Sequence, residues 1–217
     1  MGAAIPKQYL SLLGSTVIEH TVRCFLNHPR IKGVVVVIAP HDVHWDKIPL
    51  KGAPSLFIAE GGAERYHSVL NGLAKLAGIA RSRDWVLVHD AARPCVRHND
   101  IDHLIATLAD HPVGGLLGVP VSDTVKRADS QGNVLETVSR AGLWRALTPQ
   151  MFRLDDLSHA LRHVVDNNLL VTDEAAAMEL AGFSPRMVSG HADNIKITHP
   201  QDLVLAELYL KQQENQQ

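Results

Sequence analysis

Cysteine, aromatic residues and long hydrophobic runs are all scarce in this sequence of 217 residues. The 2 cysteines, Cys24 and Cys95, are too few for a disulfide framework, which favours a cytoplasmic location. The longest apolar run, residues 34–39, is far shorter than the ~20 residues that a membrane-spanning helix needs. The formal net charge is only −2, so nothing indicates general binding to nucleic acid or to a membrane surface.

Apolar runs alternate with helical patterns along the first half of the chain. Continuous runs at 34–39, 55–59 and 85–89 are typical of strands covered on both faces of a parallel sheet, and 113–121 is a fourth candidate. Helical patterns occupy 16–27, 63–76 and 101–109, the first with the capping-box spacing of Thr16 and Glu19. We therefore predict an α/β fold, with residues 1–217 forming a single domain around one doubly wound, mostly parallel sheet. Ligands bind beyond the carboxyl ends of the strands in such sheets.

The pattern changes after Pro120. Residues 123–140 alternate weakly around a turn signal at 129–133, which predicts a hairpin-like arm. An isolated hairpin is marginally stable in water, so we expect the arm to pack on another surface, such as a second subunit. Farther along the chain the sequence predicts a turn at 148–150, helices at 154–165, 173–181 and 201–210, and short strands at 185–188 and 195–198.

An acidic residue and an arginine follow the strand predicted at 85–89. Asp90 is placed at the carboxyl end of that strand, where it could hold a hard cation such as Mg²⁺ through oxygen. Arg93 carries a guanidinium fork suited to a phosphate. A structural alternative is that Asp90 caps the following turn and pairs with Arg93, and from spacing alone the two interpretations are about equal.

Two further segments have chemistry of their own. Gly61 and Gly62 lie between a predicted strand and a predicted helix, where backbone can approach a base or a phosphate, although a tight turn is the better explanation of these residues taken alone. Asp193 and Lys196 bracket a short apolar stretch, and the lysine could stabilise a transferring phosphoryl group. A solvated edge strand is the alternative there.

The 13 histidines raise the question of a metal site. His159 and His163 are four residues apart on a predicted helix, which is the spacing of a two-histidine metal face, but no third ligand accompanies them. Solvated or core histidines are the expected explanation. Neither cysteine has a neighbouring histidine, which argues against a thiol nucleophile.

No single motif decides the function, but seven segments occur in a characteristic order. They are Pro6-Lys7-Gln8-Tyr9, Gly61-Gly62-x-Glu64-Arg65-x-x-Ser68-Val69, His89-Asp90-Ala91-Ala92-Arg93-Pro94, Asp123-Thr124-Val125-Lys126, Thr148-Pro149-Gln150, Thr172-Asp173-Glu174-Ala175 and Asp193-Asn194-Ile195-Lys196. In this order the sequence closely resembles the 2-C-methyl-D-erythritol 4-phosphate cytidylyltransferases of the non-mevalonate isoprenoid pathway. The resemblance extends from Pro6 to Leu210.

The resemblance implies a reaction between CTP and methylerythritol phosphate that gives CDP-methylerythritol and pyrophosphate, with Mg²⁺. It implies that two lysines flank the α-phosphate, and these match Lys7 and Lys196. The matched CTP-binding positions are Gly61, Gly62, Ala63, Ser68, Asp90 and Ala91. The matched substrate-side positions are Arg93, Thr124, Arg140, Thr148 and Thr172. The implied metal ligands are Asp90 and Asp193.

The resemblance also bears on assembly and on the start of the sheet. Arg140 on the arm matches a residue that reaches the substrate phosphate of a neighbouring subunit, which implies a homodimer that shares its two sites. The family pattern begins with a strand and a glycine-rich loop ahead of Pro6, so we expect this first strand and loop to be absent here. Two alternatives stay open: a cytidylyltransferase for another polyol phosphate such as ribitol 5-phosphate, and a non-catalytic nucleotide-binding subunit.

Overall fold

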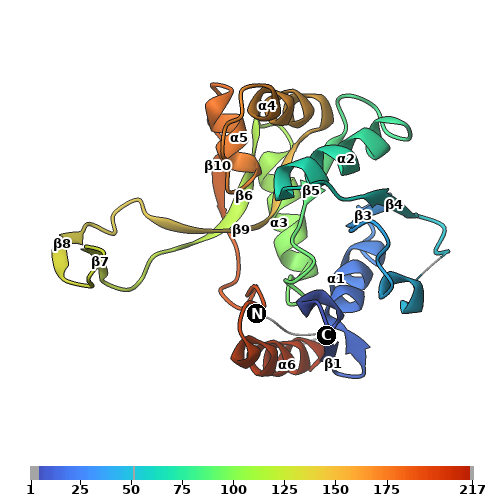
Figure 1. Ribbon diagram of the computed structural model, residues 1–217, viewed down its shortest axis with the longest axis horizontal. Helices are drawn as coiled ribbons and strands as arrows, with labels where there is room; N and C mark the ends of the chain where they lie inside the picture. The colour runs from blue at the N-terminus through green and yellow to red at the C-terminus, as the bar shows by residue number, and fades with distance from the viewer. Residues whose placement is uncertain (1–4, 51, 216–217) are drawn as a thin grey trace.

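The computed structural model describes residues 5–50 and 52–215, and these form alternating strands and helices (Figure 1). The strands are β1 (Ser11–Leu12), β2 (Ser15–Thr16), β3 (Val34–Ile38), β4 (Leu56–Glu60), β5 (Trp85–Val88), β6 (Gly114–Pro120), β7 (Val125–Ala128), β8 (Val134–Val138), β9 (Trp144–Arg153) and β10 (Arg186–Ser189). The helices are α1 (Val17–Leu26), α2 (Arg65–Ala77), α3 (His98–Leu108), α4 (Leu154–Asp166), α5 (Glu174–Leu180) and α6 (Pro200–Glu214), with 3₁₀ turns η1 (Lys7–Tyr9) and η2 (Trp45–Lys47).

The strands form two principal sheets, so the prediction of one mostly parallel sheet is wrong for the described residues. Four strands are ordered β10-β6-β9-β5, and β9 runs antiparallel to both of its neighbours. The second sheet is the parallel pair β3-β4. β5 pairs with β9 along one edge, and β3 pairs with β4 along one edge. Within residues 5–50 and 52–215, no strand pairs with the other edge of β5 or with the other edge of β3. The ladder of hydrogen bonds is therefore interrupted between these two strands.

Shared helical layers hold the two sheets together in spite of this interruption. On one face, Leu73 of α2 packs into the same buried cluster as Val86 of β5, and α4 and α5 complete that layer. On the opposite face, Phe25 of α1 lies in a cluster that includes Val34 of β3 and Leu87 of β5. Apolar side chains on both faces therefore keep the α/β layering that the sequence predicted.

Local signals explain why the first helix begins where it does. The Thr16 side chain accepts a hydrogen bond from the Glu19 amide, and the Glu19 carboxylate accepts from the Thr16 amide, which is the predicted capping box. The positions of β3, β4 and β5 also agree with the apolar runs to within two residues at either end.

Two predictions about the second half are wrong. Residues 148–150 are not a turn but the middle of β9, where the Thr148–Pro149 peptide bond is cis. Residues 195–198 are not a strand but an irregular segment, and the Ile197 amide donates to the carbonyl oxygen of Ala92. This irregular path brings the segment against the loop that follows β5.

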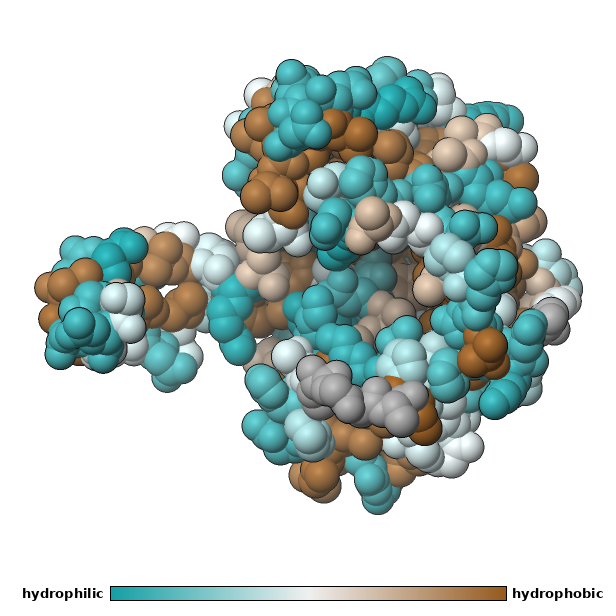
Figure 2. Space-filling model, viewed as in Figure 1, coloured by the Kyte–Doolittle hydropathy of each residue, from teal (hydrophilic) through white to brown (hydrophobic). Residues whose placement is uncertain are grey.

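Strands β7 and β8 form an antiparallel hairpin that stands clear of the rest of the molecule (Figures 1 and 2). Val134 and Leu135 on β8 are 62% and 63% exposed. This arm, residues 123–140, therefore presents apolar side chains to its surroundings instead of burying them within the chain. In the part of the chain that the structure describes, no helix is long and apolar enough to cross a membrane.

Candidate active site

Asp90, two residues beyond the end of β5, is surrounded by cations from separate parts of the chain. Its Oδ2 lies 3.0 Å from Lys196 Nζ and 3.4 Å from Arg93 Nε, and its Oδ1 lies 3.4 Å from Arg65 Nη2. Asp90 is 14% exposed at its side chain, so these contacts are partly shielded from water. We call Asp90, Lys7, Arg65, Arg93 and Lys196 the Asp90 cluster.

The electrostatics confirm that these charges act on one another. Burial alone would raise the pKa of Asp90, but the hydrogen bond and charge of Lys196, with Arg65 and Arg93, lower it to about 2. The pKa of Lys7 is lowered by burial and by the positive charge of Lys196, while the charge of Asp90 opposes this. Lys7 and Lys196 therefore lie close enough to repel each other, as two groups that share one anionic ligand would.

A buried asparagine fixes the position of Arg93. Arg93 Nη1 donates to the backbone oxygen of Asn194 at 2.8 Å, and the Asn194 side chain donates to the backbone oxygen of Thr148 at 2.7 Å. Asn194 is fully buried, so these bonds are shielded from competition with water. The loop after β5, the middle of β9 and the segment before Lys196 are thereby joined in one arrangement.

The neighbouring histidine has a structural role. Burial lowers the pKa of His89 to about 4, so the ring is neutral at pH 7. Its Nε2 donates to the Arg93 carbonyl oxygen at 3.0 Å, which leaves Nδ1 to accept from the Thr148 hydroxyl at 3.0 Å. The same hydroxyl oxygen accepts from the Asp90 amide at 3.2 Å. Thr148 therefore orients the loop that carries Asp90.

The two glycines form a tight turn between β4 and α2. The Gly61 amide donates to the carbonyl oxygen of Ile38, and the Gly62 amide donates to Ser68 Oγ at 3.0 Å. A Cβ at Gly62 would lie 2.4 Å from the Cβ of His67, so only glycine fits. Ala63 follows as an exposed residue. The turn lies at the carboxyl end of β4, and Arg65, three residues after Gly62, reaches Asp90 beyond the carboxyl end of β5.

Not every residue matched by resemblance lies in the Asp90 cluster. Ala91 is exposed beside Asp90, and Thr172 is exposed two residues before Glu174 at the start of α5. Thr124 and Arg140 lie exposed at the base of the arm, where Arg140 Nη1 donates to the backbone oxygen of Ser122. Within this chain, the described contacts of Arg140 do not include any residue of the cluster.

Asp193 contacts other partners than Asp90 does. Its carboxylate forms an ion pair with Arg97, and its Oδ2 also accepts from the Gln213 side chain, whereas the ion pairs of Asp90 are all with the cluster. The two carboxylates thus have different cationic partners, because the chain turns after Ala192 and aims Asp193 toward α6. Within the described ranges, no group of three or more His, Cys, Asp or Glu side chains is suited to a metal. His159 and His163 therefore belong to no such group.

Asp90 by itself nevertheless fits a magnesium site. Mg²⁺ is commonly held by one or two carboxylates together with substrate phosphates and water, and the carboxylate of Asp90 is fully ionised at neutral pH. The donor set supports Asp90 as a protein ligand, and the assignment of Asp193 as a second ligand stays a prediction.

Sequence reasoning assigned no role to several polar residues that hold the site together. Glu174 is 1% exposed and binds Arg65 through both of its oxygens, at 2.5 and 3.1 Å. Gln150 donates to Asp173 and accepts from the Ala175 amide, which fixes the start of α5 against β9. The pairs Glu64-Arg65 and Asp173-Glu174 could have indicated these roles from the sequence, because each places charge beside a matched position.

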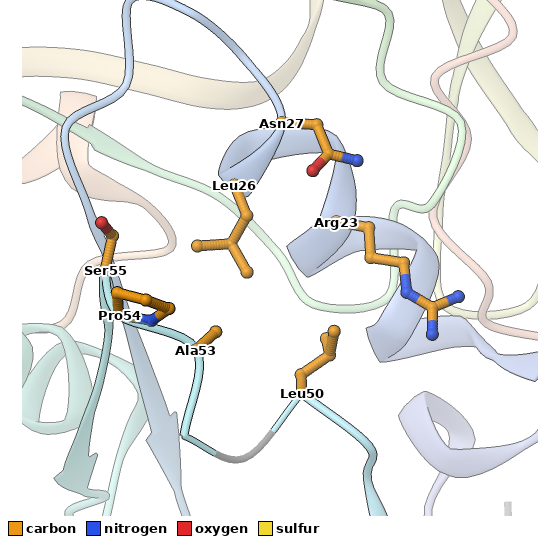
Figure 3. A pocket seen from close by; sticks show the side chains of 7 residues that line it. All are labelled: Arg23, Leu26, Asn27, Leu50, Ala53, Pro54 and Ser55. Carbon is orange, nitrogen blue, oxygen red and sulfur yellow. The ribbon is translucent and has the colours of Figure 1, made fainter.

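Two surface pockets lie away from the Asp90 cluster. One, of about 410 Å³, lies between the end of α1 and the start of β4 and is lined by Arg23, Leu26 and Ser55 among others (Figure 3). The other, of about 560 Å³, lies at the ends of β3 and β4 and includes Ile38, Asp42 and Glu60. Neither contains a residue of the Asp90 cluster.

Comparisons with known proteins identify the family of the chain. The family model described as 2-C-methyl-D-erythritol 4-phosphate cytidylyltransferase (IspD) matches residues 1–212. The chain belongs to the 2-C-methyl-D-erythritol 4-phosphate cytidylyltransferase family. The matched range of the cytidylyltransferase family includes every residue of the Asp90 cluster and the whole arm.

Individual relatives of the cytidylyltransferase family give the same result. A protein of that name from Pseudomonas syringae pv. syringae (strain B728a) is 54% identical over 204 residues, which are 94% of this chain and 86% of the relative. One from Aeromonas hydrophila subsp. hydrophila is 54% identical over 217 residues, 100% of this chain and 87% of the relative. A solved Francisella tularensis cytidylyltransferase superposes with a TM-score of 0.85 at 36% identity, covering 94% of this chain and 93% of the other. A solved 4-diphosphocytidyl-2C-methyl-D-erythritol synthase gives 0.86 at 41% identity, covering 94% and 95%.

Proposed function

We propose that this chain transfers the cytidylyl group of CTP to 2-C-methyl-D-erythritol 4-phosphate, in isoprenoid precursor biosynthesis. The observation that carries the proposal is the Asp90 cluster, in which Lys7, Arg93 and Lys196 from separate segments lie around one ionised carboxylate, while Glu174 neutralises Arg65. A cluster with this excess of positive charge suits a triphosphate and a second phosphate. Family membership identifies which nucleotide and which polyol phosphate these are.

The reaction needs charge stabilisation more than proton transfer. An oxygen of the acceptor phosphate forms a bond to the α-phosphorus of CTP, and the bond from that phosphorus to the β-phosphate oxygen breaks, so that pyrophosphate leaves with the electron pair. The attacking oxygen is already ionised, so no general base is required. Lys7 and Lys196 stabilise the negative charge that develops at the α-phosphoryl group. Mg²⁺, held by Asp90, would neutralise charge on the triphosphate.

The other matched residues orient the two substrates in this proposal. Backbone at Gly61 and Gly62 approaches the cytosine, with Ala63, Ser68 and Ala91 beside the nucleoside. Arg93, which is fixed by Asn194, binds the acceptor together with Thr148 in the middle of β9 and Thr172 before α5. The proposal also includes a cytoplasmic location, which the low cysteine content of the sequence favours.

The direct test measures CTP-dependent release of pyrophosphate with methylerythritol phosphate and, side by side, with ribitol 5-phosphate. We expect a higher kcat/KM with methylerythritol phosphate. Preference for ribitol phosphate would replace the acceptor in the proposal. Binding of CTP without turnover of either acceptor would favour a non-catalytic nucleotide-binding subunit instead.

We further propose that two copies of the chain form a homodimer through the arm, and that Arg140 of each copy serves the site of the other. The exposed Val134 and Leu135 support an interface. The described side-chain contact of Arg140 is with Ser122 and not with the Asp90 cluster of its own chain, which supports the exchange. Equilibrium sedimentation should therefore show a dimer.

A complementation assay tests the exchange. Arg140→Ala and Lys196→Ala are each expected to have low activity, but a mixture that has exchanged subunits should regain activity. Each mixed dimer then contains one site with both Arg140 and Lys196 intact. No recovery after demonstrated subunit exchange would mean that Arg140 acts within its own chain.

A further inference from the structure

Arg65 contacts two carboxylates that come from different elements. Its Nη1 lies 2.5 Å from Glu174 Oε1, and its Nη2 is shared between Glu174 Oε2 at 3.1 Å and Asp90 Oδ1 at 3.4 Å. The two short contacts to Glu174 form a bidentate pair, whereas the contact to Asp90 is long. Arg65 is therefore held mainly by Glu174 and only weakly by Asp90.

Because Glu174 is buried, its carboxylate depends on Arg65 for a cationic partner. Glu174 is 1% exposed, and burial raises its pKa while the Arg65 guanidinium acts in the opposite direction. A buried carboxylate that lost its cation would be left without compensation. Arg65, in turn, is 37% exposed at its side chain and could rotate toward another carboxylate if Glu174 lost its charge.

The pair also lies at a junction of the segments that carry the site. Arg65 is the first residue of α2, directly after the Gly61–Gly62 turn, and Glu174 is the first residue of α5, directly after Thr172 and Asp173. Gln150 joins the same start of α5 to β9 through the Ala175 amide at 2.8 Å. The ion pair thus connects the nucleotide side of the proposed site with its acceptor side.

We propose that Glu174 is a positioning residue that keeps Arg65 from occupying Asp90, and so leaves the Asp90 carboxylate available to the Mg²⁺ that accompanies the triphosphate. This inference rests on the proposed function, because it concerns the same site. When Glu174 is neutral, the nearest remaining carboxylate in contact with Arg65 is Asp90, and the guanidinium shifts onto it. Arg65 then competes with Mg²⁺ for the same oxygens.

The experiment compares CTP affinity, measured by calorimetry in the presence of Mg²⁺, for four forms of the full chain. Glu174→Gln should bind CTP about 10- to 100-fold more weakly than the parent, the usual effect of removing a residue that orients a ligating group. The double variant R65Q/E174Q should recover most of this loss, since it lacks the competing guanidinium. Glu19→Gln is the matched control, because Glu19 is also buried and pairs with an arginine, Arg23, at 3.1 Å.

Affinities are compared at a temperature well below the lowest thermal midpoint of the set, so that a loss of stability does not count as a loss of binding. A purely structural role for Glu174 predicts a lower midpoint with unchanged CTP affinity, as for Glu19→Gln, and that result overturns the inference. A double variant that binds as weakly as Glu174→Gln, or more weakly, also overturns it.

Turnover of the parent chain separates the two proposals. A parent that binds CTP but transfers no cytidylyl group overturns the proposed function, while the affinities of the variants still decide the role of Glu174. A fully active parent whose Glu174→Gln variant matches Glu19→Gln overturns only the inference about Glu174. A parent that does not bind CTP overturns both.

Discussion

Replacing Lys196 with alanine tests whether the Asp90 cluster stabilises the transferring phosphoryl group. Lys196 Nζ lies 3.0 Å from Asp90 Oδ2, and its side chain is 42% exposed, so it can move from the carboxylate to a phosphate at little cost. Loss of one positioned charge of this kind typically lowers kcat by about 10²- to 10³-fold, or about 3–4 kcal/mol of transition-state stabilisation. We expect Lys196→Ala to fall at the lower end of this range.

We expect the smaller decrease in kcat because Lys7 remains in the Lys196→Ala variant. Both lysines are assigned to the same phosphoryl group, and the charge of Lys7 stays in place when Lys196 is replaced. Lys7 then supplies part of the missing stabilisation. The expected decrease in kcat is therefore about 10²-fold, with a smaller change in KM for CTP.

Protonation of Asp90 does not contribute to the expected decrease in kcat. Loss of Lys196 removes one of the interactions that keep the pKa of Asp90 near 2, but even its ordinary value of 3.8 leaves the carboxylate ionised at pH 7. The decrease in kcat should thus have the same size from pH 6.5 to pH 8. A decrease confined to the acid end would point to protonation of Asp90 instead.

The assay is steady-state release of pyrophosphate, with Lys211→Ala as control, because Lys211 is an exposed lysine on α6 that pairs only with Glu207 among the contacts described. The control should keep the parent rate. A Lys196→Ala variant within about threefold of the parent would remove Lys196 from the mechanism, since a positioned transition-state charge contributes far more than that.

Three further predictions concern other parts of the molecule. Arg140→Ala should raise KM for the polyol phosphate and leave CTP affinity unchanged in calorimetry, and an equal loss of CTP affinity would contradict its assignment to the acceptor. Gly62→Ala should weaken CTP binding about tenfold, because its Cβ would lie 2.4 Å from the Cβ of His67, whereas Gly78→Ala, with its nearest atom at 3.5 Å, should bind CTP normally. Since burial lowers the pKa of His89 from 6.5 to about 4, the folded state binds fewer protons than the unfolded state in that window. The free energy of unfolding should therefore fall by up to about 3 kcal/mol as the pH drops from 6.5 to 4, and His89→Gln should flatten that part of a denaturant-based pH profile.

Segments with strong local signals were predictable from the sequence. The runs of valine and isoleucine in β3 and the aliphatic residues of β5 have few polar positions, so only a strand covered on both faces accommodates them. The capping box at Thr16 likewise depends on residues three apart and needs no tertiary information.

Strand β9 was missed because its signals are tertiary. Its middle contains Thr148, Pro149 and Gln150, which in isolation favour a turn. In the fold, Thr148 accepts from the Asp90 amide and Gln150 binds the start of α5, so buried partners from distant segments satisfy these polar side chains. Such partners are far away in the sequence, and no local pattern reports them.

The candidate site shows the same division. Asp90 and Arg93 were found because a strand end followed by charge is a local pattern, and Lys7 and Lys196 were found through the order of the motifs. The ion pair of Asp193 with Arg97 was not anticipated, because the turn that aims Asp193 at Arg97 has no local signature. Glu174 was overlooked because its importance comes from burial, which the sequence alone does not give for a glutamate at a helix start.

The distribution of charge explains how a chain with a net charge of −2 can bind a triphosphate. Within the Asp90 cluster, three cations contact one carboxylate and a fourth, Lys7, has its pKa lowered by burial and by the charge of Lys196. Holding like charges together is unfavourable in the free protein, and an anionic ligand relieves that repulsion when it binds. The buried Glu174 carboxylate reduces this repulsion because it neutralises the charge of Arg65. The remaining positive charge is thereby concentrated on Lys7, Arg93 and Lys196, the residues assigned to the two phosphates.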